Sequence, residues 1–175
     1  AYRMMGELGR AYHCADRAAE ISPDHLTARK MAAELAYQGD DFASAEKHLS
    51  VILHKAPQDP EALNLLSRTL AAQNEPEEAL KIIDQALARG TDQLQMKLQR
   101  AALIQEIEGP HAAVDTLRVI NSEHPGQYPV ILDLVETLSQ AGETDQAIST
   151  AQQALHQEDL EHTRDQKAEL HLVTG

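Results

Sequence analysis

Alanine recurs along this chain at a fixed spacing, and this period constrains the fold more than any other feature. Five alanines follow one another at intervals of 34 positions: Ala11, Ala45, Ala79, Ala113 and Ala147. Seven residues after each of them stands a second apolar residue, namely Ala18, Ile52, Ala86, Ile120 and Ala154. Proline follows twelve residues after three of them, at Pro23, Pro57 and Pro125. A fixed period of this length is typical of repeat proteins, in which similar units stack on one another.

Each period contains two amphipathic helical patterns. In the stretch 76–87, Ala79, Ile82, Ile83 and Ala86 fall on one helical face, and Pro76 occupies a first helical position. Pro110 has the same place in the next period. The other pattern comes earlier in the period, with Ile131, Leu134, Val135 and Leu138 on one face of the stretch 128–141. Asp59 and Pro60 supply an N-cap and a first helical residue for a further helix.

Glycine is expected to end the first helix of each period in the left-handed conformation, because glycine carries no Cβ to clash there. The positions are Gly6, Gly39, Gly109 and Gly142, with Asn74 in place of glycine in the middle of the chain. The connection after Gly39 is one residue longer than the others, and the one after Gly109 is one shorter. The first helix within 94–108 can therefore be assigned one residue in either direction.

The expected helices follow from these signals. A remnant of a first helix covers 1–5 and its partner covers 9–21. The later first helices are expected at 25–38, 60–73, 93–108 and 128–141. Their second helices are expected at 42–55, 76–89, 110–123 and 144–156, and a last helix at 160–173.

The pattern resembles that of tetratricopeptide repeat (TPR) proteins, in the form of a bacterial-type array of several repeats. The second-helix half of the family motif, a small, a bulky and a small residue followed by proline, matches well. The first-helix half is degenerate. Its aromatic position holds Ala28, Leu63 and Ile131, its Leu-Gly pair reads Met31-Ala32, Leu66-Ser67 and Leu134-Val135, and its closing tyrosine is replaced by Leu35, Leu70 and Leu138.

The resemblance implies an all-α fold, a right-handed superhelical solenoid of antiparallel helix pairs. We expect a single domain over 1–175, with a partial repeat at 1–23, repeats at 24–57, 58–91, 92–125 and 126–159, and a capping or partial helix at 160–175. The incomplete first repeat predicts exposed apolar surface and self-association at that end.

Composition excludes several function classes. The chain carries 15 basic and 28 acidic residues, a net charge of −13, which disfavours binding to nucleic acid or to anionic lipid. No apolar stretch is long enough to insert into a membrane. Only 3% of the residues are aromatic, so alanine and leucine must fill the core. The single cysteine is compatible with the cytoplasm or the periplasm.

No arrangement of residues predicts catalysis, a metal or a cofactor. Nine histidines are present, but none forms a His-Glu-x-x-His motif, and we interpret them as solvated residues of second helices and loops. The closest group, His156, Glu158 and His162, spans a predicted turn. Cys14 and His13 are neighbours in sequence and do not face each other on a helix, so we expect Cys14 to be a buried structural residue.

First helices line the concave groove of TPR arrays, and partners bind there as extended peptides or helices. The groove positions implied for this chain are Arg29, Tyr37, Asn64, Arg68, Gln99 and Glu136. Arginine can hold a carboxylate through two parallel hydrogen bonds, and asparagine can donate to and accept from a peptide backbone. Ala33 stands where the carboxylate clamp of chaperone-binding TPR proteins needs asparagine, so that clamp is not expected. Equally, these groove residues can be ordinary polar residues on a solvent-exposed surface, with no role in binding.

The resemblance favours a non-catalytic adaptor or scaffold that binds a protein or peptide partner. Two alternatives stay open. The chain can be the substrate-recruiting arm of a larger enzyme, such as a sulfotransferase or glycosyltransferase, since 167–172 is faintly similar to a linking helix of such proteins. It can also be a repeat subunit of a bacterial polysaccharide-export or secretion apparatus.

Charge is unevenly distributed along the chain, and this predicts a salt-dependent interaction. No lysine or arginine occurs in 119–163, whereas Arg29, Lys30, Arg68, Lys97 and Arg100 lie on earlier first helices. A partner of complementary polarity is expected to bind more weakly as salt screens these charges. Binding measured at low and at high ionic strength checks this, and an unchanged dissociation constant would contradict it.

Overall fold

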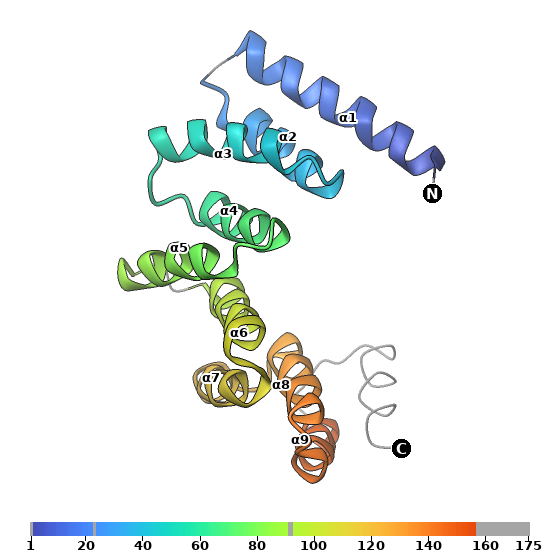
Figure 1. Cartoon of the computed structure of the whole chain (residues 1–175), viewed down its shortest axis with the longest axis vertical. Coiled ribbons are helices and arrows are strands. Elements are labelled where there is room, and N and C mark those ends of the chain that lie inside the picture. Colours follow the sequence, from blue (N-terminus) through green and yellow to red (C-terminus); the bar gives the residue numbers. More distant parts are fainter. Residues whose placement is uncertain (1, 23, 91–92, 157–175) are drawn as a thin grey trace. The chain divides into compact units, whose positions relative to one another are not determined.

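The computed structural model describes residues 2–22, 24–90 and 93–156, and over these residues the chain is helical (Figure 1). The helices are α1 (Tyr2–Ile21), α2 (Leu26–Gln38), α3 (Phe42–Lys55), α4 (Pro60–Ala72), α5 (Pro76–Ala88), α6 (Leu94–Glu108), α7 (Pro110–Glu123), α8 (Tyr128–Gln140) and α9 (Thr144–His156). The described part of the chain contains no strand. The expected all-α fold of helix pairs is thereby confirmed. The expected helix at 160–173 and the His156, Glu158 and His162 group lie outside the described residues or side chains.

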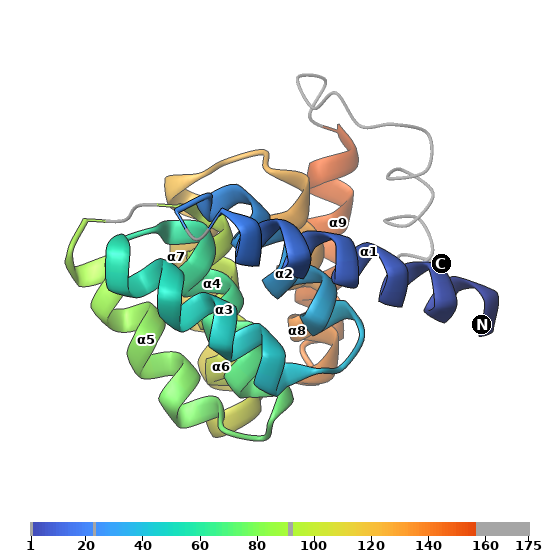
Figure 2. The ribbon, with the colours of Figure 1, turned by 90° about the horizontal axis from the view of Figure 1, so that it is seen from above.

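The chain forms two compact units, Ala1–Met96 and Lys97–Gly175, and each is described by itself. In the first unit, α1 packs along α2, α2 pairs with α3, and α4 pairs with α5 (Figures 1 and 2). In the second unit, α8 packs against both α7 and α9. The single domain that we expected from the sequence stays a prediction.

The helices keep the period of the alanines strictly. The first helices of successive repeats begin at Leu26, Pro60, Leu94 and Tyr128, and the second helices begin at Phe42, Pro76, Pro110 and Thr144. The uncertain register of 94–108 is therefore resolved, since α6 begins in frame. Its end differs from that of the other first helices. It continues to Glu108, and Gly109 then serves directly as the N-cap of α7.

Small residues make the contact within each helix pair. Ser67 of α4 is fully buried, and its hydroxyl donates a hydrogen bond to the carbonyl oxygen of Ala79 on α5 over 3.2 Å. The residues one period from Ser67 on either side, Ala33 and Ala101, are buried as well. The periodic alanines of the second helices are equally buried: Ala45, Ala79, Ala113 and Ala147. Small side chains on both helices allow close backbone approach, which is why the core needs so few aromatic residues.

Polar residues begin several helices, as the sequence indicated for Asp59. The Asp59 carboxylate accepts a hydrogen bond from the backbone N–H of Ala62 over 3.0 Å, which caps α4. Asp41 caps α3 in the same way through the N–H of Ser44. Pro60, Pro76 and Pro110 occupy first helical positions, where a missing N–H is tolerated.

One part of the glycine prediction is wrong. Gly39 has an ordinary φ of −94°, and the left-handed residue of that turn is Asp40, with φ 59°. Asp40, Asn74 (φ 66°) and Gly142 (φ 80°) are then spaced by whole periods, so the connection that looked one residue longer is regular. Aspartate tolerates this conformation because its short side chain bonds locally. The first-helix motif of the second repeat shifts by one residue accordingly, so its Leu-Gly position is Ala32-Ala33, and Met31 is exposed.

The predicted break near Gly6 is also wrong, since α1 runs as one helix through Gly6 and Gly9. No described helix of this repeat folds back on α1, and the residues that such a helix would cover are exposed, including Ala11 and Ala18. Cys14 is exposed too, contrary to the expectation of a buried structural cysteine.

A buried histidine links α1 to α3 and corrects the interpretation of all histidines as solvated. His48 is 2% exposed, its Nε2 lies 3.4 Å from Oδ1 of Asp16, and the Tyr12 ring packs edge-on against it. Burial lowers the pKa of His48 below its usual range. The Asp16 carboxylate opposes this shift, while Arg29 and Lys47 reinforce it. Burial in the native structure therefore favours the neutral form of this imidazole.

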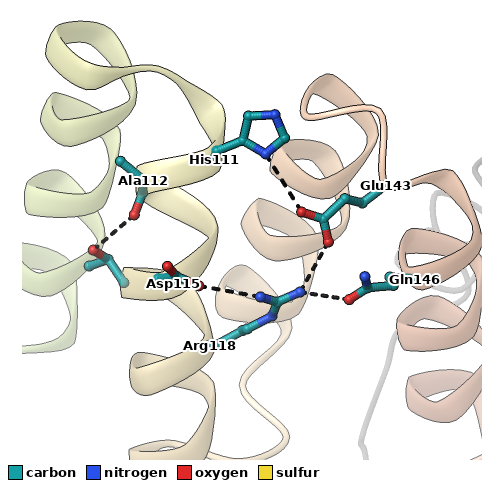
Figure 3. A network of polar contacts seen from close by, with 7 residues as sticks. His111, Ala112, Asp115, Arg118, Glu143 and Gln146 are labelled. Atoms are coloured by element: carbon teal, nitrogen blue, oxygen red, sulfur yellow. Dashed lines mark hydrogen bonds and ion pairs between the residues drawn. The ribbon is translucent and has the colours of Figure 1, made fainter.

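A polar network joins α7 to the beginning of α9 in the second unit (Figure 3). The Arg118 guanidinium donates to Glu143 over 3.1 Å and to Gln146 over 2.6 Å, and it also contacts Asp115. His111 approaches the other oxygen of Glu143 at 3.6 Å. Since Glu143 directly precedes α9 and contacts two residues of α7, the network links α7 to the first turn of α9.

The repeat turn predicts opposite effects for two glycine substitutions. Gly142→Ala forces a Cβ into a positive-φ position and is expected to lower the free energy of unfolding by about 1–2 kcal/mol. Gly6→Ala lies inside a helix with nothing within 4 Å of the new Cβ, and is expected to raise it by about 0.5–1 kcal/mol. Urea unfolding followed by circular dichroism measures both, and equal signs would contradict the assignment.

The buried imidazole predicts an acid-sensitive stability. Because the folded pKa of His48 lies below its value of 6.5 in an unfolded chain, its contribution is complete above about pH 6.5 and is lost as pH falls toward the folded pKa. His48→Gln is expected to remove that part of the pH dependence between pH 7.5 and 5. Asp16→Asn removes the carboxylate that favours the charged form and so lowers the folded pKa of His48 further, which makes the loss of stability below pH 6.5 larger and extends it to lower pH. Melting temperatures across this range check both, and an unchanged profile in His48→Gln would be evidence against the assignment.

Candidate functional site

A large cleft of the first unit lies between α2 and α4. Its volume is about 590 Å³, within the range of sites that hold small ligands or peptide side chains. From α2 it is lined by Lys30, Met31, Glu34 and Leu35, and from α4 by Glu61, Ala62, Asn64, Leu65 and Arg68. Leu49 of α3 and the residues Gln93 and Gln95 complete it. We refer to this space as the α2–α4 cleft.

The cleft combines an apolar wall with polar groups at its edge. Leu65 belongs to the core and Leu35 is partly buried, whereas Met31 is 57% exposed. An exposed methionine beside these two leucines presents a flexible apolar surface that can adapt to a bound side chain. Some of the polar groups already form ion pairs or hydrogen bonds within the protein, and others do not.

Lys30 is paired within the protein. Its ammonium lies 2.7 Å from a carboxylate oxygen of Asp59 and 2.7 Å from one of Glu61. Burial opposes the charge of Lys30, but the hydrogen bonds to these two carboxylates outweigh it and raise the pKa of the lysine above its usual range. The positive charge of Lys30 is thus balanced by Asp59 and Glu61.

Arg68 has a different environment. Its guanidinium carbon lies 4.5 Å from the centre of the Tyr37 ring, a cation–π arrangement. Tyr37 packs in turn against Phe42, with 6.0 Å between ring centres. Among the described residues, Arg68 forms no ion pair with a carboxylate. Its side chain is therefore held in place by an aromatic ring while its charge stays unbalanced.

Asn64 carries an unsatisfied group. Its Oδ1 atom is sealed from solvent and has no hydrogen-bond donor among the described residues. A buried acceptor without a partner costs about 1–3 kcal/mol, so such groups are uncommon and each calls for an explanation. Asn64 lines the cleft one helical turn before Arg68.

A smaller cleft occurs in the second unit. It has a volume of about 120 Å³ and is lined by α6 residues, by Leu117 and by Asp133, Glu136, Thr137 and Gln140 of α8. Thr137 donates to Gln105, which donates to Gln140 over 2.6 Å. Burial raises the pKa of the Asp133 carboxyl, and the neighbouring Glu136 raises it further.

The structure brings together three of the six predicted groove residues. Asn64 and Arg68 line the α2–α4 cleft, and Tyr37 supports Arg68. Glu136 lies in the smaller cleft of the second unit. Gln99 is half-buried and lines neither space.

Arg29 faces away from the cleft and is not among its lining residues. Its guanidinium approaches the carbonyl oxygen of Ala19 on α1 at 3.4 Å. The one-residue shift of the repeat frame explains this, because Arg29 corresponds to Leu63, a core residue one period later.

Sequence reasoning missed Lys30 and Glu34 as cleft residues. Both can be found by counting back one period from Asn64 and Arg68 once the frame is correct. Exposure of Met31 could not be found in this way, because an apolar residue on a helix is normally assigned to the core.

Two of the five cations expected along the earlier first helices, Lys30 and Lys97, are paired with carboxylates. Lys97 contacts Glu123 at 2.6 Å, much as Lys30 contacts Asp59 and Glu61. Over the described ranges, no group of three His, Cys, Asp or Glu side chains is placed to hold a metal ion. The helices in the described part of the chain are all too short or too polar to cross a membrane.

Comparisons with known proteins relate part of the chain to one repeat family. Residues 2–68 match the family model described as tetratricopeptide repeat. No curated protein matches the chain. Among solved structures, a thermophilic TPR protein from Thermus thermophilus is similar over 98% of this chain and 93% of its own length, with a TM-score of 0.74 and 17% identity.

Two further structures have the same fold. A tetratricopeptide repeat protein from Parabacteroides merdae is similar over 98% of this chain and 64% of its own, with a TM-score of 0.77 and 17% identity. YrrB, described as a TPR protein with an unusual peptide-binding site, is similar over 97% of this chain and 85% of its own, with a TM-score of 0.62 and 16% identity. At these identities the likeness establishes the fold.

Proposed function

We propose that this chain, which has the fold of TPR proteins and matches their family model over residues 2–68, is a non-catalytic protein–protein interaction module that binds a peptide or helix of a partner in the α2–α4 cleft. The observation that carries this proposal is the unsatisfied Oδ1 of Asn64 in a cleft of about 590 Å³. A polypeptide ligand supplies backbone N–H donors that can satisfy such an acceptor.

The other contents of the cleft support a peptide ligand. Met31 and Leu65 offer apolar contact for a side chain, while Asn64 and Arg68 offer polar contacts one helical turn apart. Peptide recognition commonly uses this combination, in which main-chain hydrogen bonds are accompanied by side-chain pockets. YrrB provides a parallel, because its description names a peptide-binding site on the same fold.

Two exposed apolar residues allow a matched test of where a peptide binds. Met31 in the cleft and Val119 on α7 are both 57% exposed. Random dodecapeptides displayed on phage are selected on the immobilised chain, and the recovered peptides are synthesised and titrated. Met31→Glu places a charge against the apolar wall and is expected to weaken their binding at least tenfold.

Val119→Glu adds the same charge at equal exposure outside the cleft and is expected to change binding less than twofold. Circular dichroism of both variants verifies that they are folded. Equal loss in the two variants, or the recovery of no binding peptide, would refute the proposed function.

A further inference from the structure

Some charged side chains of the cleft already contact an opposite charge and others do not, and this difference indicates which charge a ligand should carry. We propose that the α2–α4 cleft selects an acidic-aliphatic peptide segment, in which one aspartate or glutamate pairs with Arg68 and an adjacent aliphatic side chain packs on Met31 and Leu65. This inference rests on the proposed function and adds the class of partner.

Arg68 is the cation of the cleft whose charge is available to a ligand. Lys30, the other cation that lines it, already contacts two carboxylates at 2.7 Å. The guanidinium carbon of Arg68 lies over the Tyr37 ring, 4.5 Å from its centre. Stacking of this kind leaves the N–H edge free, and that edge matches a carboxylate with two parallel hydrogen bonds.

Asn64 sets the orientation of the ligand backbone. It precedes Arg68 by four residues on α4, so both side chains lie on the same helical face about 6 Å apart along the axis. The unpaired Oδ1 is sealed from solvent, and a rotation about the Cβ–Cγ bond when the ligand binds would turn it toward the cleft to accept a peptide N–H. An extended chain advances about 3.3 Å per residue, so the bonded N–H and the acidic side chain belong to residues about two positions apart.

The remaining acidic groups limit how much negative charge the ligand can carry. Glu61 is engaged by Lys30, and Glu34 accepts a hydrogen bond from Gln38 over 3.2 Å. Both carboxylates line the cleft and repel a run of acidic residues. A single acid beside an aliphatic residue is therefore favoured over a polyacidic tract.

The test uses the peptides selected on the full chain, each synthesised as recovered and with its Asp and Glu replaced by Asn and Gln. Fluorescence anisotropy with labelled peptides measures the dissociation constants. We expect acidic residues next to Leu, Ile, Val or Met to be enriched among the recovered peptides, and the amide forms to bind at least tenfold more weakly.

Arg68→Met is expected to bind the acidic peptides at least tenfold more weakly and the amide peptides no more than twofold more weakly. Arg68→Lys keeps the charge without the planar fork and is expected to retain part of the difference. Lys81→Met is the control, since Lys81 is an exposed cation of α5 and its loss changes the net charge equally. We expect less than a twofold effect from it.

Two results would overturn the inference while leaving the proposed function intact. One is a set of Met31-dependent peptides without acidic enrichment, or with basic residues that would pair with Glu34. The other is an equal effect of Arg68→Met on acidic and amide forms. If no peptide depends on Met31, the proposed function fails and the inference fails with it.

Discussion

The close contact of small residues between paired helices is the interaction on which the rest of this structure depends. Ser67 and Ala79 meet at 3.2 Å through a hydroxyl and a carbonyl oxygen, and both side chains are fully buried. A larger residue at either position would separate the helices and open the core. The same requirement recurs once in every period, and it explains why alanine is frequent and aromatic residues make up only 3% of the chain.

This contact also determines which residues line the cleft. Because Ala33 and Ser67 must face their partner helices, the rotation of α2 and of α4 about their axes is fixed. Residues that precede these two by three positions, Lys30 and Asn64, then line the α2–α4 cleft. Core packing thus determines which positions of α2 and α4 line the cleft. The identity of the side chains at those positions is not restricted in the same way.

Much of the fold could be predicted from the sequence, because proline and the periodic alanines define the second helices closely. The prediction failed where a residue adopts a conformation or a degree of burial that is unusual for its type. Asp40 adopts the left-handed conformation that we assigned to Gly39. Because of this one-residue error in the repeat frame, we predicted Arg29 in the groove, whereas its guanidinium lies against Ala19 of α1. His48 is buried although the pattern counts only apolar residues as core. The unpaired Oδ1 of Asn64 depends on what surrounds it in space, and no sequence pattern reports that.

The chain has a net charge of −13, so added salt should change the affinity for a basic partner and for an acidic peptide in opposite directions. A basic partner is attracted over long distances, so salt weakens its binding. An acidic peptide is repelled by the chain as a whole and held only by the local contact with Arg68. Salt screens long-range repulsion between exposed charges more than it screens a pair that is partly enclosed in a cleft. Moderate salt should therefore leave an acidic ligand bound or favour it, opposite to the dependence that charge distribution along the sequence predicts.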